Sequence, residues 1–238
     1  MKIVWNDQTV RWFQHASEFT GYHRKLSEMI LEQIPNGGTL CDVGCGAGLI
    51  DFELSPYFKE ITCVDISQEA VNAVKKEAKS RDISNISSLC IDGQELEGQW
   101  DVVMALFHGG PRVLERYFHL AKDVFVLATH GTLVGNFGPK SHKVRKCFDV
   151  AGTKEILDAK GVKYKLLELS LEYGQPLCDF QEAEAFVEAY TMPMEKSEMD
   201  AYLKDHLQHT EDNRFPYYLP NEKRMGLFII RRDENENF

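Results

Sequence analysis

The 238-residue sequence lacks several patterns that mark specialised classes of protein. Its six cysteines include no C-x-x-C pair, so they are not spaced like a zinc or redox motif, and we expect no metal. Its longest apolar runs, such as "VFVLA" at 124–128, are strand-length and far shorter than a membrane span. The opening "MKIVWNDQTVRW" lacks the basic segment and apolar core of a signal peptide. These absences favour a cytoplasmic protein that binds no membrane.

Positive charge is also scarce. Lys and Arg number 27 against 37 Asp and Glu, which gives a formal net charge of −10, and no dense block of Lys or Arg is present. Sequence-independent binding of nucleic acid relies on clustered cations that displace counterions from the phosphates. We therefore expect a small-molecule substrate and no nucleic-acid partner, in a chain that is a monomer or a homodimer.

Short β-branched runs alternate with helical patterns along most of the chain. The predicted strands are 39–43, 60–67, 86–93, 100–107, 123–131, 162–174 and 225–232. The predicted helices include one that ends at "PNGG" (35–38), then 49–58, one capped by Ser67, 109–121, about 142–160, 180–190 and 195–208. The strands show no strict polar–apolar alternation, which is typical of a parallel sheet covered by helices on both faces.

A glycine-rich segment, "LCDVGCGAGLIDFELS" (40–55), joins the first predicted strand to a helix. Its glycines are Gly44, Gly46 and Gly48. A dinucleotide fingerprint, G-x-G-x-x-G/A, would need a small residue where Leu49 stands, and the G-K-[ST] of a phosphate loop is absent. Asp42, just before the turn, would repel a pyrophosphate and attract an ammonium group. The loop therefore favours a ligand with a positive amine.

The segment "DVGCGAG" (42–48) resembles the first motif of the class I S-adenosylmethionine-dependent methyltransferases. Asp65, at the end of the second predicted strand, matches the carboxylate with which that family holds the ribose hydroxyls. The segment "IDG" (91–93) resembles the motif whose acidic side chain meets the adenine amino group, and "WDVVMALFHGG" (100–110) resembles the segment that contacts the methionine part and faces the acceptor. The resemblance spans roughly residues 38 to 130.

This resemblance implies an α/β, Rossmann-like sheet of seven strands in the order 3-2-1-4-5-7-6, with an antiparallel last strand and helices on both faces. It implies a methyltransferase that uses S-adenosyl-L-methionine, releases S-adenosyl-L-homocysteine and methylates a small molecule. The cofactor-binding residues that it implies are Asp42, Gly44, Cys45, Gly46, Gly48, Asp65, Ile66, Asp92, Gly93 and Leu106.

The sequence lacks the motifs that would indicate several other functions. The [DN]-P-P-[FYW] motif of nucleobase- and amino-methylating relatives is replaced by "ALFHGG" (105–110), and paired cysteines of an arsenite-methylating site are absent. An NAD-linked oxidoreductase conflicts with the glycine spacing. A catalytically silent S-adenosylmethionine-binding sensor or subunit stays open as an alternative, because no single residue is unmistakably catalytic.

Candidate catalytic residues are His108, after the fourth predicted strand, and His130, after the fifth. Each is a potential base, because a neutral imidazole is available near pH 7, or a loop histidine with local hydrogen bonds. The aromatic-rich segment 4–23 is interpreted either as a cover over cofactor and acceptor or as helix packing, with His15 and Tyr22 as candidate substrate-binding residues.

We expect a single domain, 1–238, because no repeat or low-complexity linker divides the chain. It comprises an N-terminal helical cap (1–37), a cofactor-binding core (38–178), a helical insertion or lid (179–223), and the last strand and tail (224–238). Apolar stripes at helical spacing in the insertion indicate core packing or substrate contacts. Within it, "NRFPYYLPNEKR" (213–224) is predicted to form a rigid extended loop because of its prolines.

Overall fold

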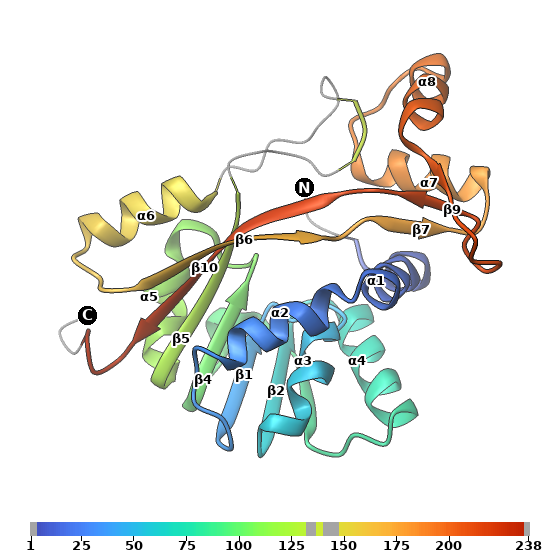
Figure 1. The fold of residues 1–238 in the computed structure, drawn as a ribbon. Helices are drawn as coiled ribbons and strands as arrows, with labels where there is room; N and C mark the ends of the chain where they lie inside the picture. Colours follow the sequence, from blue (N-terminus) through green and yellow to red (C-terminus); the bar gives the residue numbers. More distant parts are fainter. Residues whose placement is uncertain (1–3, 132–136, 140–147, 236–238) are drawn as a thin grey trace.

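The computed structural model describes residues 4–131, 137–139 and 148–235, and its centre is a seven-stranded sheet (Figure 1). The strands of this sheet are β1 (Thr39–Val43), β2 (Glu60–Asp65), β3 (Ile86–Cys90), β4 (Trp100–Leu106), β5 (Ala121–His130), β6 (Lys165–Glu172) and β10 (Glu222–Arg231). Their order is β3-β2-β1-β4-β5-β10-β6. With β10 as the seventh of these strands, this is the order expected from the sequence.

Strand directions also confirm the prediction. The pairs among β1 to β5 are parallel, whereas β10 lies between β5 and β6 and runs antiparallel to both. Parallel strands bring their carboxyl ends to one edge of a sheet, and ligands of such folds bind there. The loops that follow β1, β2, β3 and β4 therefore meet at this edge, beside the carboxyl end of β5.

Helices cover both faces of the sheet (Figure 1). They are α1 (Asp7–Thr20), α2 (Tyr22–Leu31), α3 (Leu49–Leu54), α4 (Gln68–Ser80), α5 (Val113–Tyr117), α6 (Val150–Ala159), α7 (Phe180–Tyr190) and α8 (Lys196–His206). In β1, Leu40 packs with α2 to α4, while Cys41 and Val43 pack with α5 on the other face. Burial on both faces explains why the strands show no alternation.

Two helices differ from the prediction. The helix expected at about 142–160 begins at Val150 in the described residues, because the Asp149 side chain caps it by accepting a hydrogen bond from Gly152 N at 2.9 Å. Residues 142–147 of that prediction lie outside the described residues. The helix expected over 109–121 is a 3₁₀ turn, the short α5 and a second 3₁₀ turn. Gly109, at φ 85°, and the proline that follows shorten it.

The insertion is not wholly helical. Besides α7 and α8 it holds most of a small sheet with the order β7-β9-β8, formed by β7 (Gln175–Leu177), β8 (Gln208–His209) and β9 (Tyr217–Leu219). The segment 213–224, predicted to be an extended loop, therefore contains β9 and the start of β10. One of the partners of β9, β7, lies about forty residues earlier in the chain, and the other, the two-residue β8, is too short to give a strand pattern.

The N-terminal helix and the insertion pack against each other. Trp12 of α1 lies in one apolar cluster with Phe186 of α7 and Leu203 of α8. Its Nε1 donates a hydrogen bond to Glu182 Oε1 at 3.0 Å. Figure 1 shows α1 close to β7, with α7 and α8 beyond it at the same end of the molecule. The two segments that the sequence offered as separate covers therefore form one unit.

A membrane-spanning helix, which would need greater length and a more apolar surface, is not found in the described part of the chain.

Candidate functional site

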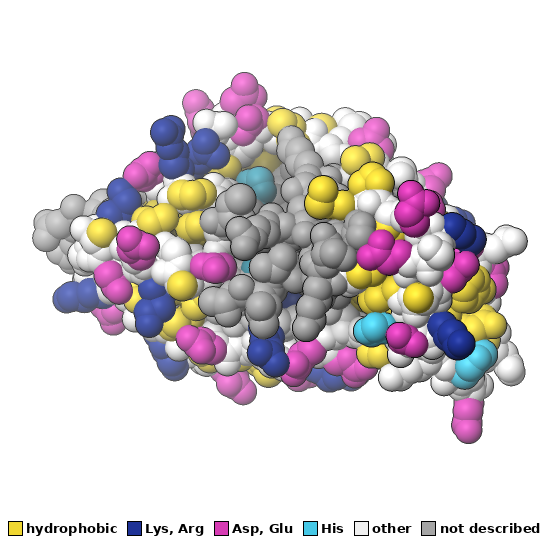
Figure 2. Space-filling view, turned by 90° about the horizontal axis from the view of Figure 1, so that it is seen from above, with side chains coloured by type: hydrophobic (Ala, Val, Ile, Leu, Met, Phe, Trp, Pro, Cys, Tyr) yellow, Lys and Arg dark blue, Asp and Glu magenta, His cyan; other side chains and the backbone are white. Residues whose placement is uncertain are grey.

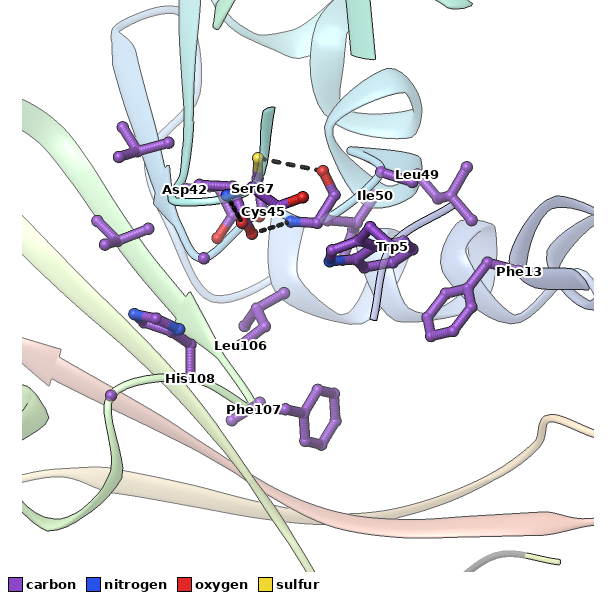
Figure 3. Close-up of a pocket in the computed structure, with 18 of the residues that line it drawn as sticks. Trp5, Phe13, Asp42, Cys45, Leu49, Ile50, Ser67, Leu106, Phe107 and His108 are labelled. Carbon is purple, nitrogen blue, oxygen red and sulfur yellow. Dashed lines mark hydrogen bonds between the residues drawn. The ribbon is translucent and has the colours of Figure 1, made fainter. Parts of the chain in front are cut away.

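A cavity of about 920 Å³ lies at the carboxyl edge of the sheet, beneath the unit formed by α1 and the insertion. One end is bounded by the glycine-rich loop and the tips of β2 and β3, and we call it the cofactor end. The other is bounded by aromatic side chains from α2, β4, the residue after β6, and α7, together with Lys223 of β10, and we call it the acceptor end. Figure 3 shows part of this arrangement, with Trp5 beside Phe13 and with Leu106, Phe107 and His108 approaching from β4.

The glycine loop adopts a conformation that only glycine accommodates easily. Gly44, Gly46 and Gly48 have φ values of 82°, 56° and 68°, in the left-handed region. A Cβ atom at Gly46 would lie 2.5 Å from the ring of Trp5, and one at Gly44 would overlap the ring of His108. The backbone of this loop is thus closely approached by rings from two different segments.

Asp65 fixes the loop to the end of β2. Its Oδ2 accepts a hydrogen bond from Gly46 N at 3.0 Å, and its Oδ1 accepts one from Ser67 N at 2.8 Å. Ser67 in turn caps α4, as predicted. Each carboxylate oxygen can accept a further hydrogen bond, and Asp65 lines the cavity. Its position suits a ligand that presents hydroxyl groups.

Two buried carboxyl groups lie under the loop. Asp42 lines the cavity, and Asp51 lies behind it in α3. Apart from each other and the Cys63 thiol, Asp42 Oδ1 and both Asp51 oxygens have no hydrogen-bond partner among the described residues. Burial, and then the charges of Asp51 and Asp65, raise the pKa of Asp42 well above its ordinary value, and burial raises the pKa of Asp51. A ligand ammonium group beside Asp42 would favour the ionised form of this carboxyl group, whereas a phosphate would disfavour it further.

The other predicted cofactor-binding residues differ in how they face the cavity. Ile66, Asp92, Gly93 and Leu106 line it, as does Cys45. The Ile66 side chain is 56% exposed, which leaves an apolar surface beside the loop. Gly48 does not line the cavity, and a Cβ atom there would meet Val74 of α4 at 2.9 Å. We therefore assign Gly48 to helix packing, in place of the ligand contact predicted for it.

The two predicted catalytic histidines lie at different places in the cavity. The His108 ring packs against Gly44 and stacks on Tyr117, whose Oη is 3.3 Å from His108 Nε2, so it belongs to the cofactor end. The His130 ring lies 4.6 Å from that of Phe107, between the two ends. Phe107 is itself unusual, because its φ of 59° is left-handed for a residue with a side chain. Such strain costs roughly 1–3 kcal/mol and clusters at functional sites.

Only one of the two predicted substrate-binding residues lines the cavity. Tyr22 is 1% exposed, and its ring lies 4.3 Å from that of Tyr173 in the acceptor end. His15 does not line the cavity; its ring packs on Phe215, and burial lowers its pKa. This position argues against the substrate contact predicted for His15.

Several acceptor-end residues escaped the sequence reasoning. Tyr173 and Phe107 lie at the ends of the predicted strands 162–174 and 100–107, and Lys223 lies in the predicted extended loop 213–224. Lys223 Nζ lies 3.8 Å from the ring centroid of Phe107. His23 is half-buried and lines the cavity, and burial together with the charge of Lys223 lowers its pKa to about 3. The sequence did offer one indication that His23 lies near the site, because it directly follows Tyr22, a candidate substrate-binding residue.

In residues 4–131, 137–139 and 148–235, no group of three or more His, Cys, Asp or Glu side chains is placed to hold a metal ion.

Comparison with known proteins points to the same site. Residues 40–125 match the family model described as a methyltransferase domain. The chain is 33% identical over 78 residues to ribosomal protein L11 methyltransferase of Idiomarina loihiensis, a match that covers 32% of this chain and 27% of that protein. It is 33% identical over 64 residues to mouse tRNA (uracil-5-)-methyltransferase homolog A, covering 27% and 10%. The chain thus matches less than a third of the length of either relative.

The fold has solved counterparts as well. A candidate methyltransferase from Bacillus halodurans C-125 superposes with a TM-score of 0.57 at 12% identity, covering 88% of this chain and 98% of that one. At this identity the similarity concerns the fold. With 88% of this chain covered, it extends beyond the segment matched by the family model.

Proposed function

The chain belongs to the class I S-adenosylmethionine-dependent methyltransferase family, and we propose that it transfers a methyl group from this donor to a small-molecule acceptor. One observation carries the proposal: a single cavity joins the glycine loop of the family motif to an enclosed aromatic end. When bound, the donor supplies a sulfonium methyl group that an acceptor lone pair attacks as the carbon–sulfur bond breaks, leaving S-adenosylhomocysteine.

The residues of the cofactor end fit this donor. We assign the ribose hydroxyls to the carboxylate of Asp65 and the amine to the buried Asp42, whose Oδ1 has no hydrogen-bond partner among the described residues apart from Asp51. Asp92 already accepts a hydrogen bond from Gln94 N at 2.9 Å, and its remaining acceptor capacity suits an adenine amino group. Ile66 offers its exposed side chain to a flat base. The loop glycines admit the methionine part close to the backbone.

Positioning and exclusion of water are the main contributions that we assign to the rest of the chain. Trp5 and Phe13, with ring centroids 4.9 Å apart, close the cavity beside the loop. Phe186 and Tyr190 of the insertion line the same cavity. Holding donor and acceptor in line in an enclosed space supplies a large share of the acceleration of a displacement reaction. In this proposal, segments 1–37 and 179–223 form the cap over the reaction.

Where the acceptor must lose a proton, we assign the base to His130 and not to His108. His130 lies at the tip of β5 against Phe107, beside the acceptor end. His108 is held between Gly44 and Tyr117, where it supports the loop. A neutral imidazole near pH 7 is able to accept a proton.

Two observations support a small acceptor: the distribution of charge on the surface, and the short stretch over which relatives named for tRNA and ribosomal-protein methylation match this chain. On the face shown in Figure 2, described Lys and Arg side chains are interspersed with Asp and Glu and form no continuous basic surface. The net charge of −10 also disfavours a polyanion. Relatives named for tRNA and ribosomal-protein methylation match about a third of the chain or less. The family match ends at residue 125, before His130, Tyr173 and Lys223 of the acceptor end.

Isothermal titration with S-adenosylhomocysteine and with NAD, followed by S-adenosylhomocysteine release in the presence of cell extract, tests the proposal. We expect binding of the first ligand only, together with extract-dependent release that a Gly46→Arg variant abolishes. Binding without any extract-dependent release would favour the alternative of a silent sensor or subunit. Absence of binding would contradict both.

A further inference from the structure

Charges are segregated within the cavity. The lining carboxyl groups lie at the tips of β1 to β3 and are those of Asp42, Asp65 and Asp92. Lys223, at the start of β10, lines the opposite, acceptor end. Another lining cation, Arg116 of α5, hydrogen-bonds to Tyr117 and so belongs to the cofactor end. A cationic donor and an anionic acceptor would each meet complementary charge in such a cavity.

Lys223 is held by aromatic rings. Its Nζ lies 3.8 Å from the ring centroid of Phe107, 4.9 Å from that of Tyr22 and 5.0 Å from that of Tyr173. Ring faces attract a cation, most strongly where water is excluded. A lysine at a surface would extend its ammonium group into water, whereas these rings keep the Lys223 ammonium inside the cavity. The strained backbone of Phe107 places the nearest ring there.

The neighbouring polar groups suit an anion. His23, whose pKa is lowered to about 3 by burial and by the charge of Lys223, is neutral at physiological pH and adds no second cation. Tyr190 lines the cavity, lies close enough to Tyr173 to raise the pKa of that residue, and its Oη has no hydrogen-bond partner among the described residues. Burial raises the pKa of Tyr190 to about 12, so its hydroxyl remains a donor. An ammonium and a phenol both donate hydrogen bonds, and a carboxylate only accepts them.

We propose that the methyl acceptor is a small aromatic carboxylate whose carboxylate is bound by Lys223 and whose flat body packs on Tyr22, Phe107 and Tyr173. This inference rests on the proposed function of the cavity and specifies its substrate class. Among the described residues, Lys223 is the one cation that lines the acceptor end, and a single ammonium group matches a monoanion better than a phosphate dianion. The aromatic rings around Lys223 match a flat apolar body.

The experiment compares acids with their own neutral amides in the protein saturated with S-adenosylhomocysteine. The probes are benzoate, 3,4-dihydroxybenzoate and indole-3-acetate, each beside its primary amide, and affinity is measured by ligand-observed NMR titration. We expect at least one acid to bind about tenfold or more tightly than its amide, as a charge-assisted hydrogen bond would give. Lys223→Met should reduce this preference to less than twofold, and Lys223→Arg should retain part of it.

Two controls accompany these variants. Arg224→Met removes a cation from the adjacent residue, which is exposed and paired with Glu222 at 3.4 Å, and should leave the acid preference unchanged. The affinity of each variant for S-adenosylhomocysteine shows that it folds, and Lys223→Gln serves if Lys223→Met does not.

The proposal is overturned if no acid binds more tightly than its amide, or if the preference survives loss of the Lys223 charge. It is also overturned if Lys223→Met weakens S-adenosylhomocysteine binding as much as Asp65→Asn does, because Lys223 would then contact the carboxylate of the donor. Failure of the wild-type protein to bind S-adenosylhomocysteine at all would instead overturn the proposed function. The two failures are therefore distinguishable.

Discussion

The two ends of the cavity are built in different ways. The cofactor end is made mainly by residues 42–67, the segment 91–94 and the end of β4, which follow one another along the chain and succeed parallel strands. The acceptor end combines Tyr22 of α2, Phe107 after β4, Tyr173 after β6 and Lys223 of β10. In the described part of the chain, the first end is acidic and rich in glycine, and the second is aromatic and carries the Lys223 ammonium group.

The cofactor end lies mostly in the part of the chain that matches other proteins, whereas the acceptor end lies mostly outside it and is particular to this chain. The family model matches residues 40–125 and therefore most of the cofactor end. The acceptor end depends on the strands and the insertion that lie outside this match. Changes at the first end should therefore alter donor affinity, and changes at the second should alter acceptor use while donor affinity is kept.

The largest effect is expected from Gly46→Ala. The new Cβ would take a left-handed conformation and lie 2.5 Å from the Trp5 ring, so the loop or the ring must move. We expect the affinity for S-adenosylhomocysteine to fall about thirtyfold, corresponding to roughly 2 kcal/mol, by isothermal titration. Gly161→Ala is the matched control, because Gly161 has φ 68° with nothing within 4 Å of a Cβ atom. Equal affinities for Gly46→Ala and wild type would contradict the assignment of this loop.

A smaller loss is expected from Asp65→Asn. The amide keeps the size of the side chain but loses the charge that strengthens its hydrogen bonds to Gly46 N, Ser67 N and a ligand hydroxyl. Hydrogen bonds to charged groups contribute about 1.5–3 kcal/mol, so affinity for S-adenosylhomocysteine should fall about tenfold or more. Asp92→Asn should reduce the affinity for S-adenosylhomocysteine less, because Asp92 lies at an exposed turn. If Asp92→Asn reduced the affinity more than Asp65→Asn, the assignment of the ribose hydroxyls to Asp65 would be wrong.

The acceptor end is tested by Phe107→Gly. Glycine suits the φ of 59°, so relief of strain offsets part of the lost ring packing, and donor affinity should stay within twofold of wild type. Loss of the ring nearest Lys223 should reduce extract-dependent S-adenosylhomocysteine release about fivefold, as expected for a buried cation–π contact of about 1–2 kcal/mol. A variant that loses donor binding in parallel would show that the two ends are not separable.

The smallest expected effect is a pH-dependent change in melting temperature caused by Asp51→Asn. Burial raises the pKa of Asp51, so the folded state binds this proton more tightly than the unfolded state does. The resulting stabilisation is complete below pH about 4 and is lost as pH rises through the raised pKa. Asp51→Asn should therefore raise the melting temperature more at pH 8 than at pH 5, by about 2–4 °C for each kcal/mol.

Differential scanning fluorimetry of the variant and of wild type at both pH values measures this difference. The lowered pKa of His23 changes stability in the opposite direction, but both proteins carry His23, so its contribution cancels. An equal change at both pH values would show that Asp51 does not titrate in this range.

The fold could be predicted wherever local patterns were sufficient. The bounds of β1 and α7 agree with the prediction residue for residue, because the first is a buried run before glycines and the second is an apolar stripe after a capping Asp179. The predictions over 142–160 and 213–224 were less accurate. The first prediction began before the cap at Asp149, where the described helix starts. In the second, Tyr217–Leu219 pairs with the distant β7 and with the two-residue β8, which is too short to be indicated by a pattern.

By itself, the sequence determined the glycine loop and the acidic residues at successive strand ends, because each lies in a short local pattern. The sheet order was implied by the family resemblance that this pattern carries, because β1 pairs with β4 and β5 with β10 across long stretches of chain. Only the tertiary structure decided that His15 lies outside the cavity, that Gly48 serves packing, and that Lys223 lies among aromatic rings. These outcomes depend on which faces of α1, α2 and β10 meet. Such contacts are set by packing between segments that are distant in the chain, and a local sequence pattern does not predict them.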